Sequence, residues 1–195
     1  MIAQPADNMG EFVMAAVESQ MLELGTEAPA FSLPDPDGEV HSLREGADAY
    51  VVMFICNHCP YVKAIRHKLV RDARALMELG VNSVAIMPND TVAYPEDSFE
   101  NMQRISKEFN FPFPYLLDET QEVARAYGAV CTPDFFGYNA NLELQYRGRL
   151  DAAGPKDEDV GLEREMFEAM RQVAETGKGP AEQIPSIGCS IKWRE

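Results

Sequence analysis

The stretch YVVMFICNHCPYV, residues 50–62, decides the fold. Its first six residues form an uninterrupted apolar run that is partly β-branched, which is typical of a central strand buried on both faces. From residue 62 to residue 76, apolar residues recur three and four positions apart, which predicts a helix that ends near Gly80. Cys56 and Cys59 therefore lie where a buried strand passes into a helix.

Strand and helix patterns alternate outward from this stretch. Upstream, an Asp37-Gly38 turn predicts a hairpin between residues 31–33 and 39–41. Downstream, the same reasoning predicts strands over 81–87 and 113–117, helices over 96–109, 120–127 and about 159–175, and a hairpin of DFFGY and LELQYRG around residues 139–141. We therefore expect one α/β domain, with a central mixed sheet, helices on both faces and an N-terminal β-hairpin extension.

The chain divides into a long central part and two short ends. Residues 1–21 are expected to form an N-terminal extension that is partly helical, because apolar residues recur at helical spacing over 9–24. Residues 22–175 form the expected domain. Residues 176–195 are rich in Gly and Pro and are expected to be irregular, but Ile187, Ile191 and Trp193 indicate that this tail packs on the domain.

Composition and charge exclude several classes of function. The 195 residues include 17 Lys and Arg against 32 Asp and Glu, a net charge of −15, which argues against nucleic acid or an anionic membrane as a partner. No apolar run approaches the roughly 18 residues of a membrane span. The first residues lack the basic start and apolar core of a secretory signal, so we expect a cytoplasmic protein. In that reducing setting, a close cysteine pair indicates redox or metal chemistry.

The C-x-x-C motif favours reactive thiols. The N–H groups and dipole at a helix start stabilise a thiolate, and a decrease in thiol pKa from about 8.5 to about 7 raises the thiolate fraction to about half at neutral pH. His58 can add positive charge or accept a proton. Five cations on the following helix either favour the thiolate or form a solvated face: Lys63, Arg66, Lys68, Arg71 and Arg74. A zinc site would normally include a second close pair of ligands, so we expect neither a metal nor another cofactor.

A second motif, YGAVCTP at residues 127–133, precedes the predicted C-terminal hairpin. A strand that ends in C-x-x-C, followed by this Thr-Pro motif and a hairpin, resembles the thioredoxin fold. The segment APAFSLPDPDGEVHSL at 28–43 resembles more specifically the redoxin superfamily, which includes the alkyl hydroperoxide reductase/thiol-specific antioxidant proteins. The segments CNHCPYVKA, PEDSFENM, CTPDFF and PSIGCSIKW resemble a bacterial branch of it, and the resemblance covers about residues 22–195.

The resemblance implies a thiol–disulfide oxidoreductase. Cys56 would be the exposed nucleophile that attacks a substrate disulfide, and Cys59 the resolving thiol. Thr132 and Pro133 would form a cis-proline loop that faces the pair and holds an extended substrate chain. The implied partners are protein or small-molecule disulfides and thiols, together with a thiol reductant.

The chain departs from the thioredoxin and peroxiredoxin patterns at informative positions. Ile55 stands where thioredoxins usually have Trp, and Tyr50 stands where they have a buried acid, so His58 would have to accept the proton. The peroxiredoxin pattern P-x-x-x-T-x-x-C would make Cys59 the peroxidatic thiol, but Val52 and Cys56 replace its Pro and Thr.

Three alternatives remain open at this stage. The first is a thiol peroxidase in which Cys59 is peroxidatic and either Arg125 or Arg147 supplies the peroxidase arginine. The second is a non-enzymatic metal-binding module. The third concerns the other thiols: Cys131 is either a third redox thiol or an apolar filler, and Cys189 either resolves an oxidised active-site thiol or is a packed or free thiol.

Overall fold

The computed structural model describes residues 16–43, 46–153 and 161–195. Its core is a five-stranded sheet in the order β6-β5-β4-β8-β9. The strands are β4 (Ala49–Phe54), β5 (Val81–Met87), β6 (Tyr115–Leu117), β8 (Asp134–Asn139) and β9 (Leu144–Arg147). The pairs β4–β5 and β5–β6 are parallel, whereas β4–β8 and β8–β9 are antiparallel, which confirms a mixed sheet.

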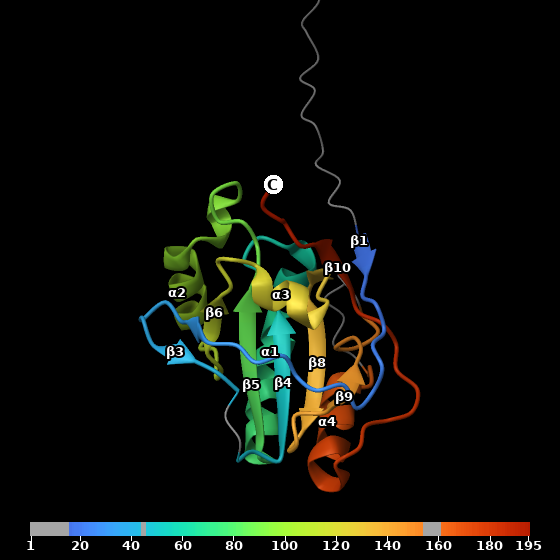
Figure 1. Cartoon of the computed structure of the whole chain (residues 1–195). Helices are drawn as coiled ribbons and strands as arrows, with labels where there is room; N and C mark the ends of the chain where they lie inside the picture. The colour runs from blue at the N-terminus through green and yellow to red at the C-terminus, as the bar shows by residue number, and fades with distance from the viewer. Residues whose placement is uncertain (1–15, 44–45, 154–160) are drawn as a thin grey trace, which may run out of the picture.

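Helices cover both faces of this sheet, as expected (Figure 1). They are α1 (Pro60–Glu78), α2 (Phe99–Glu108), α3 (Glu122–Tyr127) and α4 (Glu165–Thr176), with a 3-10 turn, η1 (Pro95–Asp97), before α2. One apolar cluster joins one face of the sheet to α1 and α4, and the other joins the opposite face to α3. β4 supplies Val51 and Met53 to the first cluster and Val52 and Phe54 to the second, because successive strand side chains point to opposite faces.

Two smaller sheets flank the core. The predicted hairpin is present as β2 (Leu33–Pro34) and β3 (Val40–His41) around the Asp37-Gly38 turn. A three-stranded sheet in the order β1-β10-β7 joins β1 (Ala16–Glu18), β7 (Cys131–Thr132) and β10 (Ile187–Ser190). It therefore unites the N-terminal extension, the C-terminal tail and the Thr-Pro motif.

Three expectations about secondary structure are wrong. The helix expected over 9–24 is replaced, in its described part, by β1 and irregular chain, because β1 pairs with β10; residues 9–15 lie outside the described residues. The tail expected to be irregular contains β10. The last helix begins at Glu165, and residues 161–164 before it are not helical.

Part of the C-terminal tail is buried. Cys189 and Ile191 are buried, although Ile187 is exposed. Among the described helices, none has both the length and the apolar character needed to cross a membrane.

Candidate functional site

The two motif cysteines lie between the carboxyl end of β4 and the start of α1. Cys59 is the N-cap residue of α1, Pro60 is its first residue, and the Lys63 N–H donates to the Cys59 carbonyl oxygen at 2.9 Å. Pro is favourable in the first helical position because its missing N–H would have no partner there. The sequence thus directs both thiols to a helix N-terminus, where the backbone dipole favours a thiolate.

Asp97 of η1 holds the turn between these cysteines. Its Oδ1 accepts the N–H of Asn57 at 2.8 Å and that of His58 at 3.3 Å. Its Oδ2 lies 2.7 Å from His58 Nδ1 and accepts a hydrogen bond from the Asn89 side chain at 2.8 Å. The carboxylate is fully buried, so these contacts replace its hydration.

Sequence reasoning did not identify Asp97, although it lies in the quoted PEDSFENM segment. It also expected His58 to replace the missing buried acid. The structure instead places Asp97 within 4.8 Å of both Cys56 Sγ and a His58 ring nitrogen, so a buried acid is supplied by a different element. The His58 ring stacks on Tyr94, and hydrogen bonding to Asp97 raises the pKa of His58.

Cys56 is buried, with 1% of its surface exposed, so the expectation of an exposed nucleophile is wrong for this conformation. Its Sγ lies 3.3 Å from Thr132 Oγ1. Burial, the hydrogen bond to Cys59 and the negative charge of Asp97 raise the pKa of Cys56 well above its usual value. The Cys56 thiol therefore retains its proton.

The pKa of Cys59 shifts in the opposite direction to that of Cys56. Hydrogen bonds from the thiols of Cys189 and Cys56, in that order, lower the pKa of Cys59, and the backbone N–H groups of Val62 and Cys189 act in the same direction. When Cys59 is protonated, its thiol can donate to the Thr132 carbonyl oxygen, which lies 3.2 Å from Sγ. The surrounding donors therefore favour the thiolate on Cys59, whereas the Thr132 carbonyl oxygen favours the protonated thiol.

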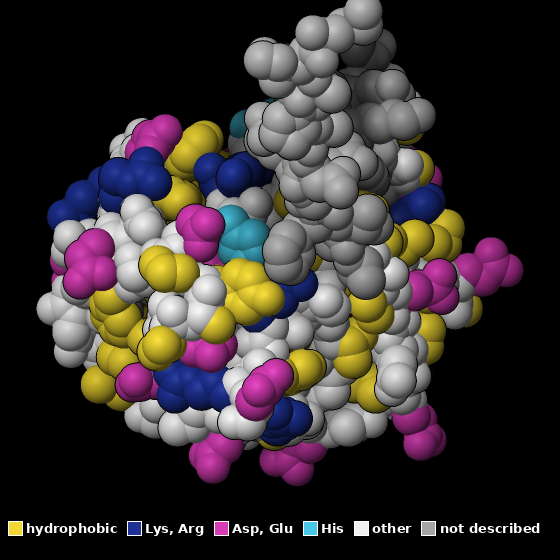
Figure 2. Space-filling model, turned by 90° about the horizontal axis from the view of Figure 1, so that it is seen from above, with side chains coloured by type: hydrophobic (Ala, Val, Ile, Leu, Met, Phe, Trp, Pro, Cys, Tyr) yellow, Lys and Arg dark blue, Asp and Glu magenta, His cyan; other side chains and the backbone are white. Residues whose placement is uncertain are grey.

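The cations of α1 do not act as one group. Arg66 is buried and donates to the Asn57 carbonyl oxygen at 3.1 Å, so it supports the backbone of the motif. Lys68 is also buried but pairs with Asp151 at 3.1 Å, and Lys63 is exposed. On the face that Figure 2 presents, positive and negative side chains lie interspersed among apolar ones.

Thr132 lies against both thiols, and the peptide bond between Thr132 and Pro133 is cis. The edge of β7, however, is paired with β10, with Cys189 opposite Thr132 and Ser190 opposite Cys131. Thr132, which was expected to help hold an extended substrate chain, is therefore paired with the chain's own C-terminal segment. Binding of substrate by Thr132 and Pro133 stays a prediction.

The two remaining cysteines have different surroundings. Cys189 belongs to the same apolar cluster as Cys56 and Cys59, whereas Cys131 precedes Thr132 in a strand and so points to the opposite face. Cys131 Sγ lies 3.6 Å from the Pro133 carbonyl oxygen, and burial, followed by the charge of Asp134, raises the pKa of Cys131. Cys131 thus fits the filler interpretation.

The two candidate peroxidase arginines have other partners. Arg147 is fully buried, forms an ion pair with Asp134, and lies over the Phe136 ring at 3.9 Å. Arg125 lies over the Trp193 ring at 4.2 Å. Both guanidinium groups are therefore held by contacts outside the Cys56–Cys59 pair.

Within the part of the chain that the structure describes, two groups of side chains could hold a metal ion. Cys56, His58 and Asp97 place one ligand atom each within 4.8 Å of one another, as do three residues near the β2–β3 hairpin: Asp35, Glu39 and His41. In the first group the protonated Cys56 and the hydrogen bond between His58 and Asp97 oppose metal binding, because a metal needs the thiolate and free lone pairs.

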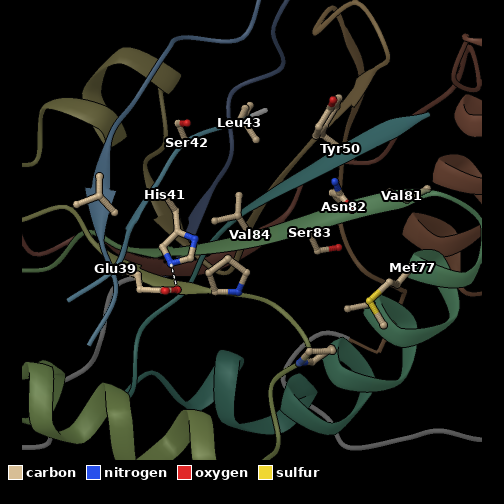
Figure 3. A pocket seen from close by; sticks show the side chains of 14 residues that line it. Glu39, His41, Ser42, Leu43, Tyr50, Met77, Val81, Asn82, Ser83 and Val84 are labelled. Atoms are coloured by element: carbon tan, nitrogen blue, oxygen red, sulfur yellow. Dashed lines mark ion pairs between the residues drawn. The ribbon is translucent and has the colours of Figure 1, made fainter. Parts of the chain in front are cut away.

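Two cavities differ in their relation to the thiols. One of about 300 Å³ lies beside the site, and its walls include Tyr61 of α1, Pro133 and Ile187 of β10. The other, of about 590 Å³, opens between β3, the first half of β5 and the end of α1, and Figure 3 shows Tyr50, Met77 and Ser83 around it. The thiols lie at the opposite, carboxyl end of β4, so the smaller cavity is the one adjacent to the candidate site.

Comparison with known proteins agrees with this architecture. The AhpC/TSA family matches residues 24–153. The chain belongs to this family. A search of curated proteins found no match.

Solved structures extend the similarity over nearly the whole chain. An uncharacterized conserved protein from Geobacillus kaustophilus is 49% identical, with a TM-score of 0.85 over 93% of this chain and 97% of that one. A hypothetical protein from Sinorhizobium meliloti is 39% identical, with a TM-score of 0.85 over 91% and 98%. The thioredoxin domain of a thiol-disulfide oxidoreductase from Bacteroides vulgatus is 20% identical, with a TM-score of 0.54 over 66% and 91%, which shows the shared thioredoxin-like fold. The family and the fold support a redox function.

Proposed function

We propose that this protein is a thiol–disulfide oxidoreductase whose working couple is Cys56 and Cys59. The observation that carries the proposal is that both thiols lie against Thr132 at the N-terminus of α1, with Cys56 Sγ 3.3 Å from its hydroxyl oxygen and Cys59 Sγ 3.2 Å from its carbonyl oxygen, while the pKa of Cys59 is lowered and that of Cys56 is raised. Such a pair holds one proton and one negative charge between two sulfurs. That arrangement suits thiol–disulfide exchange, in which a thiolate attacks a sulfur.

The exchange proceeds in two balanced steps. Cys56 passes its proton to Cys59 and attacks one sulfur of a substrate disulfide; a mixed disulfide forms and the first substrate thiolate leaves. Cys59 then attacks the Cys56 sulfur and gives its proton to the second leaving sulfur. The protein gains a Cys56–Cys59 disulfide, while the substrate gains two electrons and one proton and leaves as one thiolate and one thiol. A thiol reductant returns the protein to the dithiol by the reverse chemistry.

A variant with Cys131→Ser and Cys189→Ser tests this couple directly, because only Cys56 and Cys59 remain. After incubation in glutathione redox buffers, acid quenching and alkylation, we expect mass spectrometry to show the loss of both thiols and one intramolecular disulfide. Adding Cys56→Ser to the same variant abolishes that disulfide. An unchanged thiol count in oxidising buffer would refute the proposal, and so would a stoichiometric metal ion on the protein purified without chelator.

The lowered pKa of Cys59 favours one further activity, reduction of peroxide. The Cys59 thiolate would attack hydrogen peroxide, giving a sulfenic acid and hydroxide, and Cys56 would then form the disulfide and release water. Stopped-flow consumption of hydrogen peroxide tests this activity. A rate no faster than that of free cysteine excludes it, whereas a much faster rate that Cys59→Ser removes supports it.

A further inference from the structure

The C-terminal strand brings a third thiol to the proposed couple. In the pairing of β10 with β7, Cys189 stands directly opposite Thr132, the residue whose hydroxyl and carbonyl oxygens contact Cys56 and Cys59. Directly opposed residues in an antiparallel pair point to the same face. The register therefore directs the Cys189 side chain toward the two motif thiols.

Close backbone packing holds this strand in place. A Cβ atom on Gly188 would lie 2.2 Å from the Thr132 carbonyl oxygen, so only glycine allows this approach without displacement. On the outer side, β10 pairs with β1, and beyond its end the Ile191 N–H donates to the Val130 carbonyl oxygen at 3.0 Å. The Lys192 N–H donates to Asn89 Oδ1 at 2.9 Å. The backbone around Cys189 is thus held by β7 on one edge of β10, by β1 on the other edge, and by the hydrogen bonds of Ile191 and Lys192 after its last residue.

The Cys189 thiol lies in the same buried apolar cluster as the two motif thiols, Cys56 and Cys59. Cys59 Sγ lies 3.2 Å from the carbonyl oxygen of Thr132, the residue opposite Cys189, and the Cys189 thiol is the leading cause that lowers the pKa of Cys59. Cys59 is consequently the central sulfur, with one thiol neighbour from its own motif and one from the tail.

We propose that Cys189 is a third redox thiol, which exchanges with the Cys56–Cys59 disulfide to give a Cys59–Cys189 disulfide. This inference rests on the proposed function, because that reaction supplies the first disulfide. The Cys189 thiolate attacks Cys59 Sγ, the Cys59–Cys56 bond breaks, and Cys56 leaves as a thiolate that takes up the proton lost by Cys189. No electrons enter or leave the protein.

The exchange has a structural consequence for the site. It moves the disulfide from the motif to a bond between α1 and β10, and it frees the Cys56 thiol beside Thr132. Because Cys59 is the N-cap residue of α1, the new disulfide also links β10 covalently to α1 and keeps β10 paired with β7. The C-terminal strand would then act as an internal acceptor of the disulfide that the couple has taken from its substrate.

Three matched variants test the exchange, each with two cysteines left. The variant C56S/C131S retains Cys59 and Cys189; C131S/C189S retains Cys56 and Cys59; C56S/C189S retains Cys59 and Cys131 as the control pair. Each reduced protein is treated at low concentration with diamide, which takes two electrons and two protons from a thiol pair. Acid quenching, alkylation and peptide mass spectrometry then identify any intramolecular disulfide, and circular dichroism confirms that each variant is folded.

We expect C56S/C131S and C131S/C189S each to form an intramolecular disulfide, while C56S/C189S does not. Oxidised wild-type protein should be a mixture of two species, one with a Cys56–Cys59 disulfide and one with a Cys59–Cys189 disulfide. A folded C56S/C131S that keeps two free thiols, while C131S/C189S loses both, would overturn this inference and leave the proposed function intact. Failure of C131S/C189S to form a disulfide would instead refute the proposed function.

Gly188→Ala provides an independent test in the wild-type background. The added methyl group must displace β10 from Thr132, so we expect the fraction of Cys59–Cys189 disulfide to fall several-fold while the Cys56–Cys59 disulfide still forms. An unchanged ratio of the two disulfides would contradict the role assigned to β10.

Discussion

The regions around Cys59 and Cys131 lie on either side of Thr132, and both thiols are fully buried. Burial by itself raises the pKa of a thiol, and this is the dominant effect at Cys131, beside the Asp134–Arg147 ion pair. At Cys59, hydrogen-bond donors outweigh burial and lower the pKa. The donors around a buried sulfur, rather than its depth, therefore set the direction in which its pKa shifts.

The largest expected effect contrasts these two thiols directly. Cys59→Ser should reduce the rate of glutathione disulfide reduction by at least about 100-fold, because it removes the thiolate. Cys131→Ser should leave the rate within about two-fold, because its thiol is protonated and faces away from the couple. Both rates are measured by quenching the reaction at set times and quantifying the glutathione thiol that has been released. An equal loss of rate in the two variants would contradict the different roles assigned to Cys59 and Cys131.

The ion pair beside Cys131 should matter for stability instead. Asp134→Asn leaves the fully buried Arg147 guanidinium without its anionic partner, which should lower the free energy of unfolding by about 3–5 kcal/mol. Urea unfolding measures this loss. The alkylation rate of Cys56 should stay unchanged in the folded variant, and a marked change would mean that the two regions are electrostatically coupled.

Asp97, in contrast, should affect both stability and thiol reactivity. Asp97→Asn removes the charge that receives the Asn57, His58 and Asn89 hydrogen bonds, at an expected cost of about 1–3 kcal/mol. It also removes a negative charge that raises the pKa of Cys56, so alkylation of Cys56 should reach half its maximal rate at lower pH. Glu96→Gln, on the exposed neighbour, is the matched control and should change neither quantity.

The smallest expected effect is the pH dependence of the His58–Asp97 contact. Asp97 raises the pKa of His58 above its ordinary value of 6.5, so the protonated form stabilises the folded state. This stabilisation is fully present below pH 6.5 and is lost as the pH rises through the folded-state pKa. The stability difference between wild type and His58→Gln should therefore be larger, by about 1 kcal/mol or less, at pH 6 than at pH 9. A larger difference at pH 9 would contradict the assigned contact.

Local patterns predicted the central elements because short-range features decide them. The apolar runs that became β4 and β5, and the spacing that became α1, encode burial within a few consecutive residues. The same reasoning failed for β1 and β10. Both are short strands that exist through pairing with each other and with β7, and neither pairing leaves a local pattern in the sequence.

The candidate site divides in the same way. Two thiols at a strand–helix junction, with a Thr-Pro turn after them, were predictable because C-x-x-C and Thr-Pro are local motifs. The tertiary structure was needed to find the buried acid Asp97, the hydrogen-bond donors that lower the pKa of Cys59, and the pairing that brings Cys189 to the thiol cluster. The physical reason is that hydrogen bonds and burial, which set a thiol's pKa, come from residues that are distant in the chain and meet only after folding.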